Sequence, residues 1–246
     1  MVDNKSRLEI SPELVVEHHK LNEDYHCTVI DNFLLRPEMA VSIADHHTSE
    51  FIQAERSYPG IVYAVGQSVL SDIYRFIRFE LSEPFAFLRG NIKFSAHLSL
   101  ATLQPDQFTC LQRLCHSDPR TGTGRTNIAV LLYLFDDPAL GGTGFYRWKE
   151  EEKILHATAL EQEATNKAMP FLQENFKMFS EPPCYITGSN EVAELIHKVP
   201  AKFNRLVVYP GDMPHSAYIE QPGLLTDKVS TGRLTLNCFA SVLARS

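Results

Sequence analysis

Short apolar runs separated by turn-forming residues recur along the chain from residue 91 onward. Each run is rich in β-branched and aromatic residues, and Gly, Pro, Asp or Asn interrupts the series between runs, which is typical of strands. The six runs are 92–103, 108–118, 126–135, 142–148, 203–210 and 233–243. This series predicts a mainly β fold, arranged as a barrel or a jelly roll.

The chain before this series predicts one strand and supporting helices. Residues 25–34 combine β-branched and aromatic side chains, so we expect a strand there. Residues 38–47 have helical spacing directly after a proline, and residues 66–82 place apolar side chains near one helical face. We therefore expect residues 1–90 to form an N-terminal strand and helices that flank the β core.

Residues 149–202 interrupt the β series with a different kind of sequence. They are rich in helix formers, and residues 191–199 predict a further short helix. We expect a helical insertion within a single domain spanning 1–246, whose β core consists of 91–148 and 203–246. Such an insertion forms either a lid at the mouth of a barrel or a layer packed on the outer sheet.

Composition limits the classes of partner and compartment. The chain has 246 residues, 44% of them hydrophobic, which is enough to bury a full core. Its net charge is −7 and no basic run stands out, which argues against a nucleic-acid partner. No apolar stretch reaches roughly 18 residues, so no membrane span is expected. The five cysteines are scattered without a CxxC pair, which favours reduced thiols in a soluble cytoplasmic protein.

Three residues of the β series form a candidate metal site. His116 and Asp118 lie two positions apart on a predicted strand, so their side chains point to the same face. His215 follows an apolar strand and a Pro-Gly turn, which can bring it to the same rim. Two imidazoles and a carboxylate form the facial triad of non-haem Fe(II) oxygenases, which leaves positions open for cosubstrate and oxygen. The alternative for His116 and Asp118 is a surface turn, because a proline follows Asp118.

Arg233 is a candidate anchor for an anionic cosubstrate. Alternation along the last run puts Arg233 and Thr235 on one face and the leucines on the other. A buried arginine needs an anionic partner, and a dicarboxylate held in a bidentate fork, with help from the Thr235 hydroxyl, would supply one. The alternative orientation buries the leucines and leaves Arg233 in solvent.

The order of these motifs resembles the 2-oxoglutarate/Fe(II)-dependent oxygenase superfamily, in particular its prolyl-4-hydroxylase-like branch. The resemblance covers residues 91–148 and 203–243, with HSD at 116–118 followed by GTGR, LLYL, GGTGFYR, VVYPGDMPHS and GRLTLNCF. It implies a double-stranded β-helix fold, jelly-roll or cupin-like. It implies iron ligands at His116, Asp118 and His215, and cosubstrate-binding residues at Arg233, Thr235 and Tyr133.

Tyr133 and Arg233 each have an alternative interpretation. Tyr133 shares the interior face of its strand with Ala129 by alternation, and the alternative is an ordinary core tyrosine. Arg233 follows His215 by eighteen residues, a longer interval than the family pattern. Lys228 lies at a more usual interval, but it belongs to a polar loop. A longer loop adds little closure entropy, so we expect Arg233 to be the anchor.

The resemblance implies an Fe(II)- and 2-oxoglutarate-dependent dioxygenase. Such an enzyme uses O2 to hydroxylate a peptide or protein side chain or a small metabolite, and it releases succinate and CO2. Two other classes stay open: a non-catalytic metal- or ligand-binding β-helix module, and a cupin-type metalloenzyme that does not use 2-oxoglutarate. Arg120, Arg125 and Arg147 are candidates for contacting an anionic group near the mouth, although surface arginines are usually only solvated.

Overall fold

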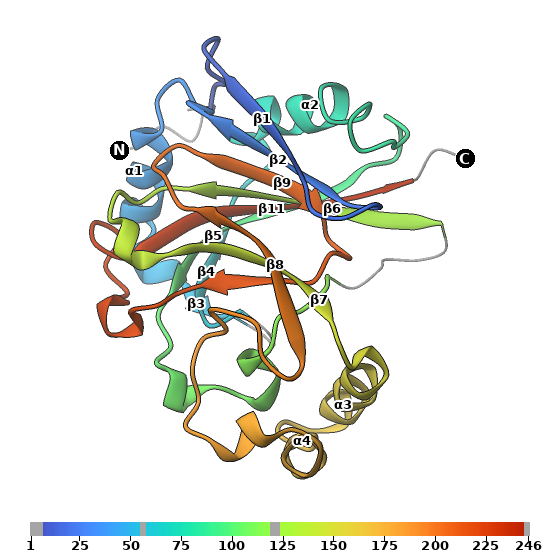
Figure 1. The fold of residues 1–246 in the computed structure, drawn as a ribbon. Helices are drawn as coiled ribbons and strands as arrows, with labels where there is room; N and C mark the ends of the chain where they lie inside the picture. Colours follow the sequence, from blue (N-terminus) through green and yellow to red (C-terminus); the bar gives the residue numbers. More distant parts are fainter. Residues whose placement is uncertain (1–6, 55–57, 119–123, 244–246) are drawn as a thin grey trace.

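Two antiparallel β-sheets face each other in the computed structural model, and helices cover the outer side of the larger one (Figure 1). The structure describes residues 7–54, 58–118 and 124–243. The larger sheet has eight strands in the order β1-β2-β9-β6-β11-β5-β4-β3, and the smaller sheet has three in the order β10-β7-β8. The expectation of a mainly β fold with flanking helices is confirmed.

The strands of the larger sheet are β1 (Val15–Lys20), β2 (His26–Asp31), β3 (Ile52–Gln53), β4 (Gly60–Ala64), β5 (Lys93–Ala101), β6 (Arg125–Tyr133), β9 (Leu206–Pro210) and β11 (Arg233–Leu243). The strands of the smaller sheet are β7 (Gly142–Trp148), β8 (Ala193–Pro200) and β10 (His215–Tyr218). The α-helices are α1 (Glu38–His46), α2 (Ser71–Phe79), α3 (Glu151–Glu163) and α4 (Met169–Asn175). Short 3₁₀ helices occur at η1 (Thr48–Glu50), η2 (Pro105–Gln107), η3 (Cys110–Arg113), η4 (Pro138–Leu140), η5 (Lys177–Ser180) and η6 (Pro222–Leu224).

The strand β11 lies in the middle of the larger sheet, where it pairs with β5 on one side and β6 on the other. Its side chains alternate between two environments. Leu234 and Leu236 pack into the core beneath the helices, whereas Arg233 and Thr235 line the space between the sheets. The interior orientation of Arg233 is therefore confirmed, and the solvent-facing alternative is wrong.

Helices α1 and α2 pack on the face of the larger sheet that is turned away from the smaller sheet. Their buried apolar residues form one cluster with leucines of β5, β6 and β11. The helix expected over 38–47 is confirmed. The helix expected over 66–82 is shorter, because residues 67–70 form turns before α2 begins.

The N-terminal part of the chain extends both edges of the larger sheet. The predicted strand at 25–34 is present as β2, but three further strands, β1, β3 and β4, were not predicted. β1 and β2 form one edge beside β9, and β3 and β4 form the other edge beside β5. Residues 1–90 thus contribute strands to the core sheet itself, in addition to supporting helices.

Along the C-terminal half, the chain passes repeatedly between the two sheets. β6 belongs to the larger sheet, β7 and β8 to the smaller, β9 to the larger, β10 to the smaller and β11 to the larger. Apolar and aromatic side chains from both sheets meet between them in a second cluster, which includes Val29, Tyr133, Phe145, Val207 and Tyr209. This alternation brings residues that are distant in sequence onto facing surfaces.

The helical insertion is shorter than expected, because residues 191–199 contain most of the strand β8 and no helix. β8 pairs with β7 along its length, with a bulge between Phe145 and Tyr146. These inter-strand hydrogen bonds override the weak helical propensity of the segment. The insertion is therefore the connection between β7 and β8, and β8 itself is part of the smaller sheet.

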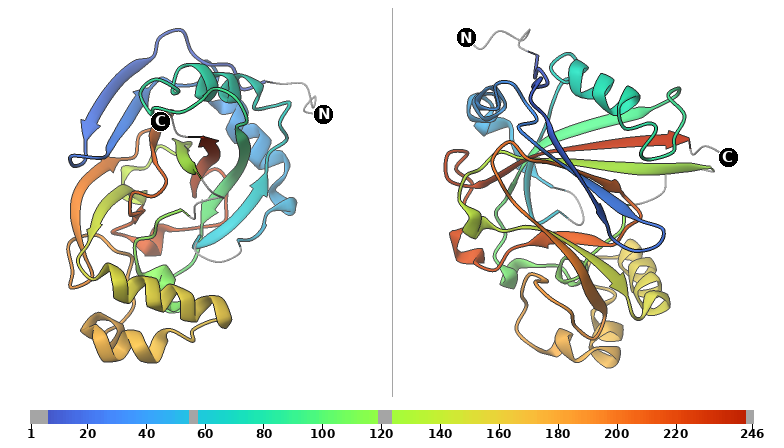
Figure 2. Two further views of the ribbon diagram at one scale, coloured as in Figure 1. Left: turned by 90° about the vertical axis from the view of Figure 1, so that its right-hand side faces the viewer. Right: turned by 45° about the horizontal axis from the view of Figure 1, so that its top comes forward.

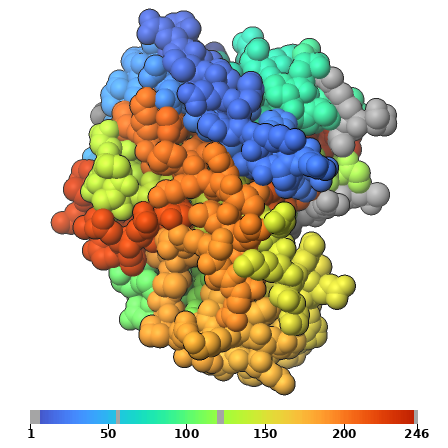
Figure 3. Space-filling model, viewed as in Figure 1, coloured from blue at the N-terminus to red at the C-terminus, as the bar shows by residue number. Residues whose placement is uncertain are grey.

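The insertion helices form a lobe at one end of the molecule, seen at the bottom of Figure 3 and in both views of Figure 2. α3 and α4 share a cluster of buried residues with Cys110 and Leu114, around η3. Among the described residues, this cluster includes none from the larger sheet. The helices therefore pack on η3 and against Trp148, at the end of β7 in the smaller sheet.

The run 108–118, expected to be a strand, forms η3 and then an extended segment. A capping box between Thr109 and Gln112 starts the 3₁₀ turn, which competes with strand pairing. Only His116 retains a sheet-like contact, as an isolated bridge with His215. This bridge places His116 beside β10, on the side of that strand that does not pair with β7.

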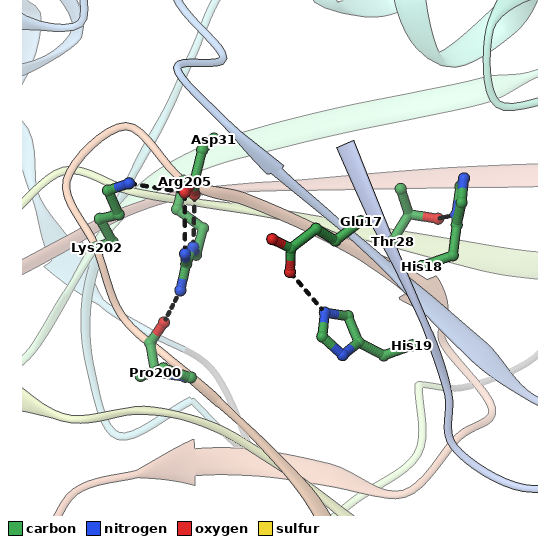
Figure 4. A network of polar contacts seen from close by, with 8 residues as sticks. All are labelled: Glu17, His18, His19, Thr28, Asp31, Pro200, Lys202 and Arg205. Carbon is green, nitrogen blue, oxygen red and sulfur yellow. Dashed lines mark hydrogen bonds and ion pairs between the residues drawn. The ribbon is translucent and has the colours of Figure 1, made fainter. Parts of the chain in front are cut away.

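A polar network fastens β2 to the turn between β8 and β9 (Figure 4). Asp31 accepts hydrogen bonds from Nε of Arg205 at 2.7 Å and from Nζ of Lys202 at 2.7 Å. Arg205 also donates to the carbonyl of Pro200. The guanidinium and the ammonium hold the pKa of Asp31 below its usual value.

Among the described helices, none is long and apolar enough to cross a membrane.

Candidate metal centre and anion pocket

Backbone hydrogen bonds bring the three predicted metal ligands together. The amide of His116 donates to the carbonyl of His215 at 2.9 Å, and the amide of His215 donates back at 2.8 Å. The amide of Asp118 donates to the carbonyl of Gly211 at 2.7 Å, in the turn after β9. One potential ligand atom from each side chain lies within 4.8 Å of the other two. The predicted grouping of His116, Asp118 and His215 is therefore present.

The orientation of the side chains leaves ligand atoms unused. Nδ1 of His215 lies 2.8 Å from the carbonyl of Met213, which holds the proton on Nδ1 and leaves the lone pair on Nε2. Nε2 of His116 lies 3.9 Å from Oδ1 of Asp118. The other carboxylate oxygen, Oδ2, is buried without a hydrogen-bond partner among the described residues. An unsatisfied buried carboxylate oxygen is costly, and a bound cation would satisfy it.

Burial controls the protonation of these groups. It lowers the pKa of His116 to about 4, with His215 adding to the effect and Asp118 opposing it. Burial also lowers the pKa of His215 to about 4, against the hydrogen bond to Met213. The pKa of Asp118 is raised by burial, which the neighbouring His116 partly offsets. Both imidazoles are thus neutral near pH 7, which is the form that binds a metal.

The donor set fits a divalent metal of the first transition row. Two imidazoles and one carboxylate leave positions open at a metal such as Fe(II), whereas a structural zinc site would close with thiolates. The nearest cysteine in sequence, Cys115, packs instead with Tyr146 and Ile186, and burial raises its thiol pKa. The thiol therefore stays protonated and does not join the set.

Gly211 is a site residue that the sequence patterns did not single out. A Cβ at this position would lie 2.7 Å from Oδ2 and 3.0 Å from Cβ of Asp118. The Pro-Gly pair after β9 was recognised only as a turn. Glycine is needed here because the Asp118 carboxylate lies against its Cα.

Arg233 is almost completely buried, at 2% exposure. Its Nε donates to the carbonyl of Leu140 at 3.1 Å, and its Nη2 donates to that of Gly142 at 2.7 Å. These bonds connect β11 to the start of the smaller sheet. Among the described residues lining the same cavity, only Asp118 carries a carboxylate, and it forms no ion pair with Arg233. The guanidinium is therefore free to pair with an anionic ligand in the cavity.

Tyrosine side chains surround Arg233. The hydroxyl of Tyr133 lies 2.6 Å from Oγ1 of Thr143, between the two sheets, so its predicted interior position is confirmed. Tyr58, Tyr185 and Tyr209 also lie within the electrostatic reach of Arg233, whose charge opposes the upward shift that burial causes in their pKa values. The sequence patterns indicated none of these three, because they come from different loops and strands.

The metal ligands and Arg233 open into one cavity of about 160 Å³. Thr235, fully buried, lines it beside Arg233. The eighteen-residue interval after His215 does not separate the two halves, since η6 and a turn before β11 take up the extra length. Lys228 is exposed in that connection and does not line the cavity.

The arginines considered for substrate contact are already engaged. Arg125 bonds with Ser241 and the carbonyl of Asn91. Arg147 forms an ion pair with Glu194. Arg120 lies outside the described residues. Arg147 is thus paired with a carboxylate, Arg125 is held by neutral groups, and neither is among the described residues that line the cavity.

Comparisons with known proteins identify a family but no activity. No curated protein matches the chain. One similar solved structure is that of EvdO2 from Micromonospora carbonacea var. aurantiaca, with 10% identity and a TM-score of 0.45 over 89% of this chain and 88% of that one. The profile of the family described as "Family of unknown function (DUF6445)" matches residues 12–240. The chain belongs to this family.

Proposed function

We propose that this protein is an Fe(II)- and 2-oxoglutarate-dependent dioxygenase. The observation that carries the proposal is one cavity that contains both groups. It joins two imidazoles and a carboxylate, free to bind a metal, to a buried arginine that has no carboxylate partner among the described residues. A metal site alone would fit many enzymes. The arginine adds a requirement for a ligand that is anionic at one end and can reach the metal with the other.

The strand connections support the same proposal. We infer that β5 to β11, with the bridge at His116, form a double-stranded β-helix of the jelly-roll type. The supporting observation is the passage of the chain between two facing sheets, which leaves β5, β11, β6 and β9 adjacent in one sheet and β10, β7 and β8 adjacent in the other.

The chain's own residues would act by binding and orientation. His116, Asp118 and His215 would hold Fe(II), and Arg233 with Thr235 would bind the remote carboxylate of 2-oxoglutarate. The ring of Tyr133 would lie beside Arg233, with its hydroxyl held by Thr143, which lines the pocket. Bound Fe(II) and 2-oxoglutarate supply oxidative decarboxylation, which yields succinate and CO2 and couples O2 to hydroxylation of a substrate.

The electrostatics of the cavity favour this binding mode. Neutral imidazoles bind the metal without first losing a proton. The two carbonyls that hold Arg233 fix its position but leave its charge uncompensated, so a carboxylate gains more here than it would in water. The surrounding tyrosine rings exclude water from the bound cosubstrate. We propose a peptide or protein side chain, or a small metabolite, as the substrate.

The first test measures metal binding, 2-oxoglutarate binding and succinate formation in purified protein. We expect Fe(II) to bind anaerobically, 2-oxoglutarate to bind only with metal present, and O2 to yield succinate. Asp118→Ala should lose metal binding and succinate, whereas Asp136→Ala, an exposed aspartate, should keep both. Arg233→Met should keep the metal and lose 2-oxoglutarate, and Lys228→Met should keep both.

Other results would point to the other classes. Metal binding that never creates a 2-oxoglutarate site would favour a cupin-type metalloenzyme. Binding of both ligands without succinate in the presence of O2 would favour a non-catalytic module. Normal succinate formation by Asp118→Ala would refute the metal-ligand assignment.

A further inference from the structure

Tyr58 is held against the core sheet by its own backbone neighbourhood. It lies just before β4, and the carbonyl of the next residue, Pro59, accepts hydrogen bonds from the amides of Thr102 at 3.0 Å and Leu103 at 3.2 Å. Gly60 then packs so closely that a Cβ there would lie 1.9 Å from the carbonyl oxygen of Leu100. The position of the Tyr58 side chain is therefore set by the end of β5.

The Tyr58 side chain enters the anion pocket. It lines the cavity that contains Arg233 and Thr235. Its hydroxyl faces the side chains of Thr235 and Ser99 and lies within the influence of the Arg233 charge. This part of the N-terminal region thus lines the pocket together with residues of both sheets.

The hydroxyl of Tyr58 is buried, and no described residue lies in hydrogen-bonding geometry with it. Two other tyrosines near Arg233 differ in this respect. The Tyr133 hydroxyl lies 2.6 Å from Thr143, and the Tyr185 hydroxyl donates to the carbonyl of Leu103 at 2.9 Å. The Thr235 hydroxyl beside Tyr58 likewise has no described residue in hydrogen-bonding geometry with it. Buried hydroxyls normally have partners, so this pair is arranged for a ligand.

We propose that Tyr58 donates a hydrogen bond to the carboxylate that Arg233 binds. The inference rests on the proposed function, since the carboxylate is the remote one of 2-oxoglutarate. A carboxylate has about four lone-pair sites, and a guanidinium fork occupies only part of them. Tyr58 and Thr235 supply donors for the remainder. The N-terminal part of the chain is then part of the cosubstrate site.

The test compares two keto acids in wild-type protein and in Tyr58→Phe, which removes only the hydroxyl. 2-Oxoglutarate has the remote carboxylate, whereas 2-oxovalerate has the same chain length and lacks it. Binding to the Mn(II)-loaded protein is measured by calorimetry without oxygen. A hydrogen bond to a charged group corresponds to a loss of roughly tenfold or more in 2-oxoglutarate affinity. The affinities for 2-oxovalerate and Mn(II) should not change.

Tyr63→Phe is the matched control. Tyr63 lies on β4, but it packs in the core on the other face of the sheet, against His47. Its loss should leave the affinity for 2-oxoglutarate unchanged. Equal affinity for 2-oxoglutarate in wild type and Tyr58→Phe would overturn the proposal, as would an equal loss for both keto acids. If wild type does not bind 2-oxoglutarate at all, the proposed function itself fails, and the inference fails with it.

Discussion

The candidate metal site depends on one residue without a side chain. Gly211 accepts a hydrogen bond from the Asp118 amide through its carbonyl and leaves space for the Asp118 carboxylate beside its Cα. The same turn leads to His215, so a single turn after β9 positions two of the three ligands. The residue types decide which atoms could bind a metal, but this turn decides how far apart the side chains of Asp118 and His215 lie.

Gly211→Ala should therefore weaken metal binding without unfolding the protein. The added Cβ would lie 2.7 Å from Oδ2 of Asp118, so the carboxylate must move. Groups that orient metal ligands typically contribute about 10- to 100-fold in affinity, and we expect a loss of about tenfold or more in Mn(II) affinity by calorimetry. Gly188→Ala is the control, since nothing lies within 4 Å of its added Cβ. Unchanged Mn(II) affinity in Gly211→Ala would contradict this account of the turn.

At the scale of elements, the insertion between β7 and β8 supports the segment that carries His116. Arg113, at the end of η3, is only 6% exposed. Its guanidinium donates to the carbonyls of Met178, Phe179 and Glu181, at the end of the insertion's helices. It also stacks over the Phe179 ring, 4.9 Å from the centroid. A buried cation thus adds to the apolar cluster that joins the insertion to the segment carrying the candidate metal site.

Arg113→Met should loosen this connection while keeping an unbranched side chain of similar reach. Three carbonyls lose a charged donor, so the free energy of unfolding should fall by about 2 to 4 kcal/mol in urea denaturation. Proteolysis of the native protein should increase within 177–181. Lys177→Met, at a side chain that is 84% exposed, serves as the control and should change stability little. Equal stability of Arg113→Met and wild type would show that the insertion is held by its apolar cluster alone.

At the scale of the whole molecule, folding buries several neutral histidines. Burial lowers the pKa values of His26, His97 and His197, and those of His116 and His215 to about 4. These pKa values are lower in the folded chain than in the unfolded chain. At a pH between the folded and the unfolded pKa of each histidine, the unfolded chain therefore binds more protons. Stability therefore decreases as pH falls through this range.

The metal-free protein should lose stability between pH 6.5 and pH 4. For His215, a shift from 6.5 to about 4 corresponds to a loss of about 2 to 3 kcal/mol at pH 4.5 relative to pH 7. Urea denaturation at both pH values, with chelator present, measures this loss. His215→Gln should show a smaller pH dependence than wild type, whereas His156→Gln, at an exposed position, should match wild type. A wild-type stability that does not change over this range would mean that the buried imidazoles take up protons without penalty.

Local pattern was sufficient for much of the β core and for the direction of the side chains around Arg233. The strands β2, β5, β6, β7, β9 and β11 follow from their apolar runs. Alternation correctly turned Arg233 and Thr235 toward the cavity and Tyr133 toward the space between the sheets. These features depend on the two-residue period of a strand, which is written in consecutive residues. The helix at 191–199 was wrong for the complementary reason, because pairing with β7 decides that segment.

By itself, the sequence determined which chemistry is available: two histidines, an aspartate and an arginine. Only the tertiary structure decided that these side chains share one cavity, that Gly211 makes room for Asp118, and that Tyr58 reaches Arg233 from the far edge of the sheet. The physical reason is that local periodicity fixes the direction of a side chain but not its distant neighbours. Those neighbours depend on strand order and on loop paths, which arise from packing of the whole chain.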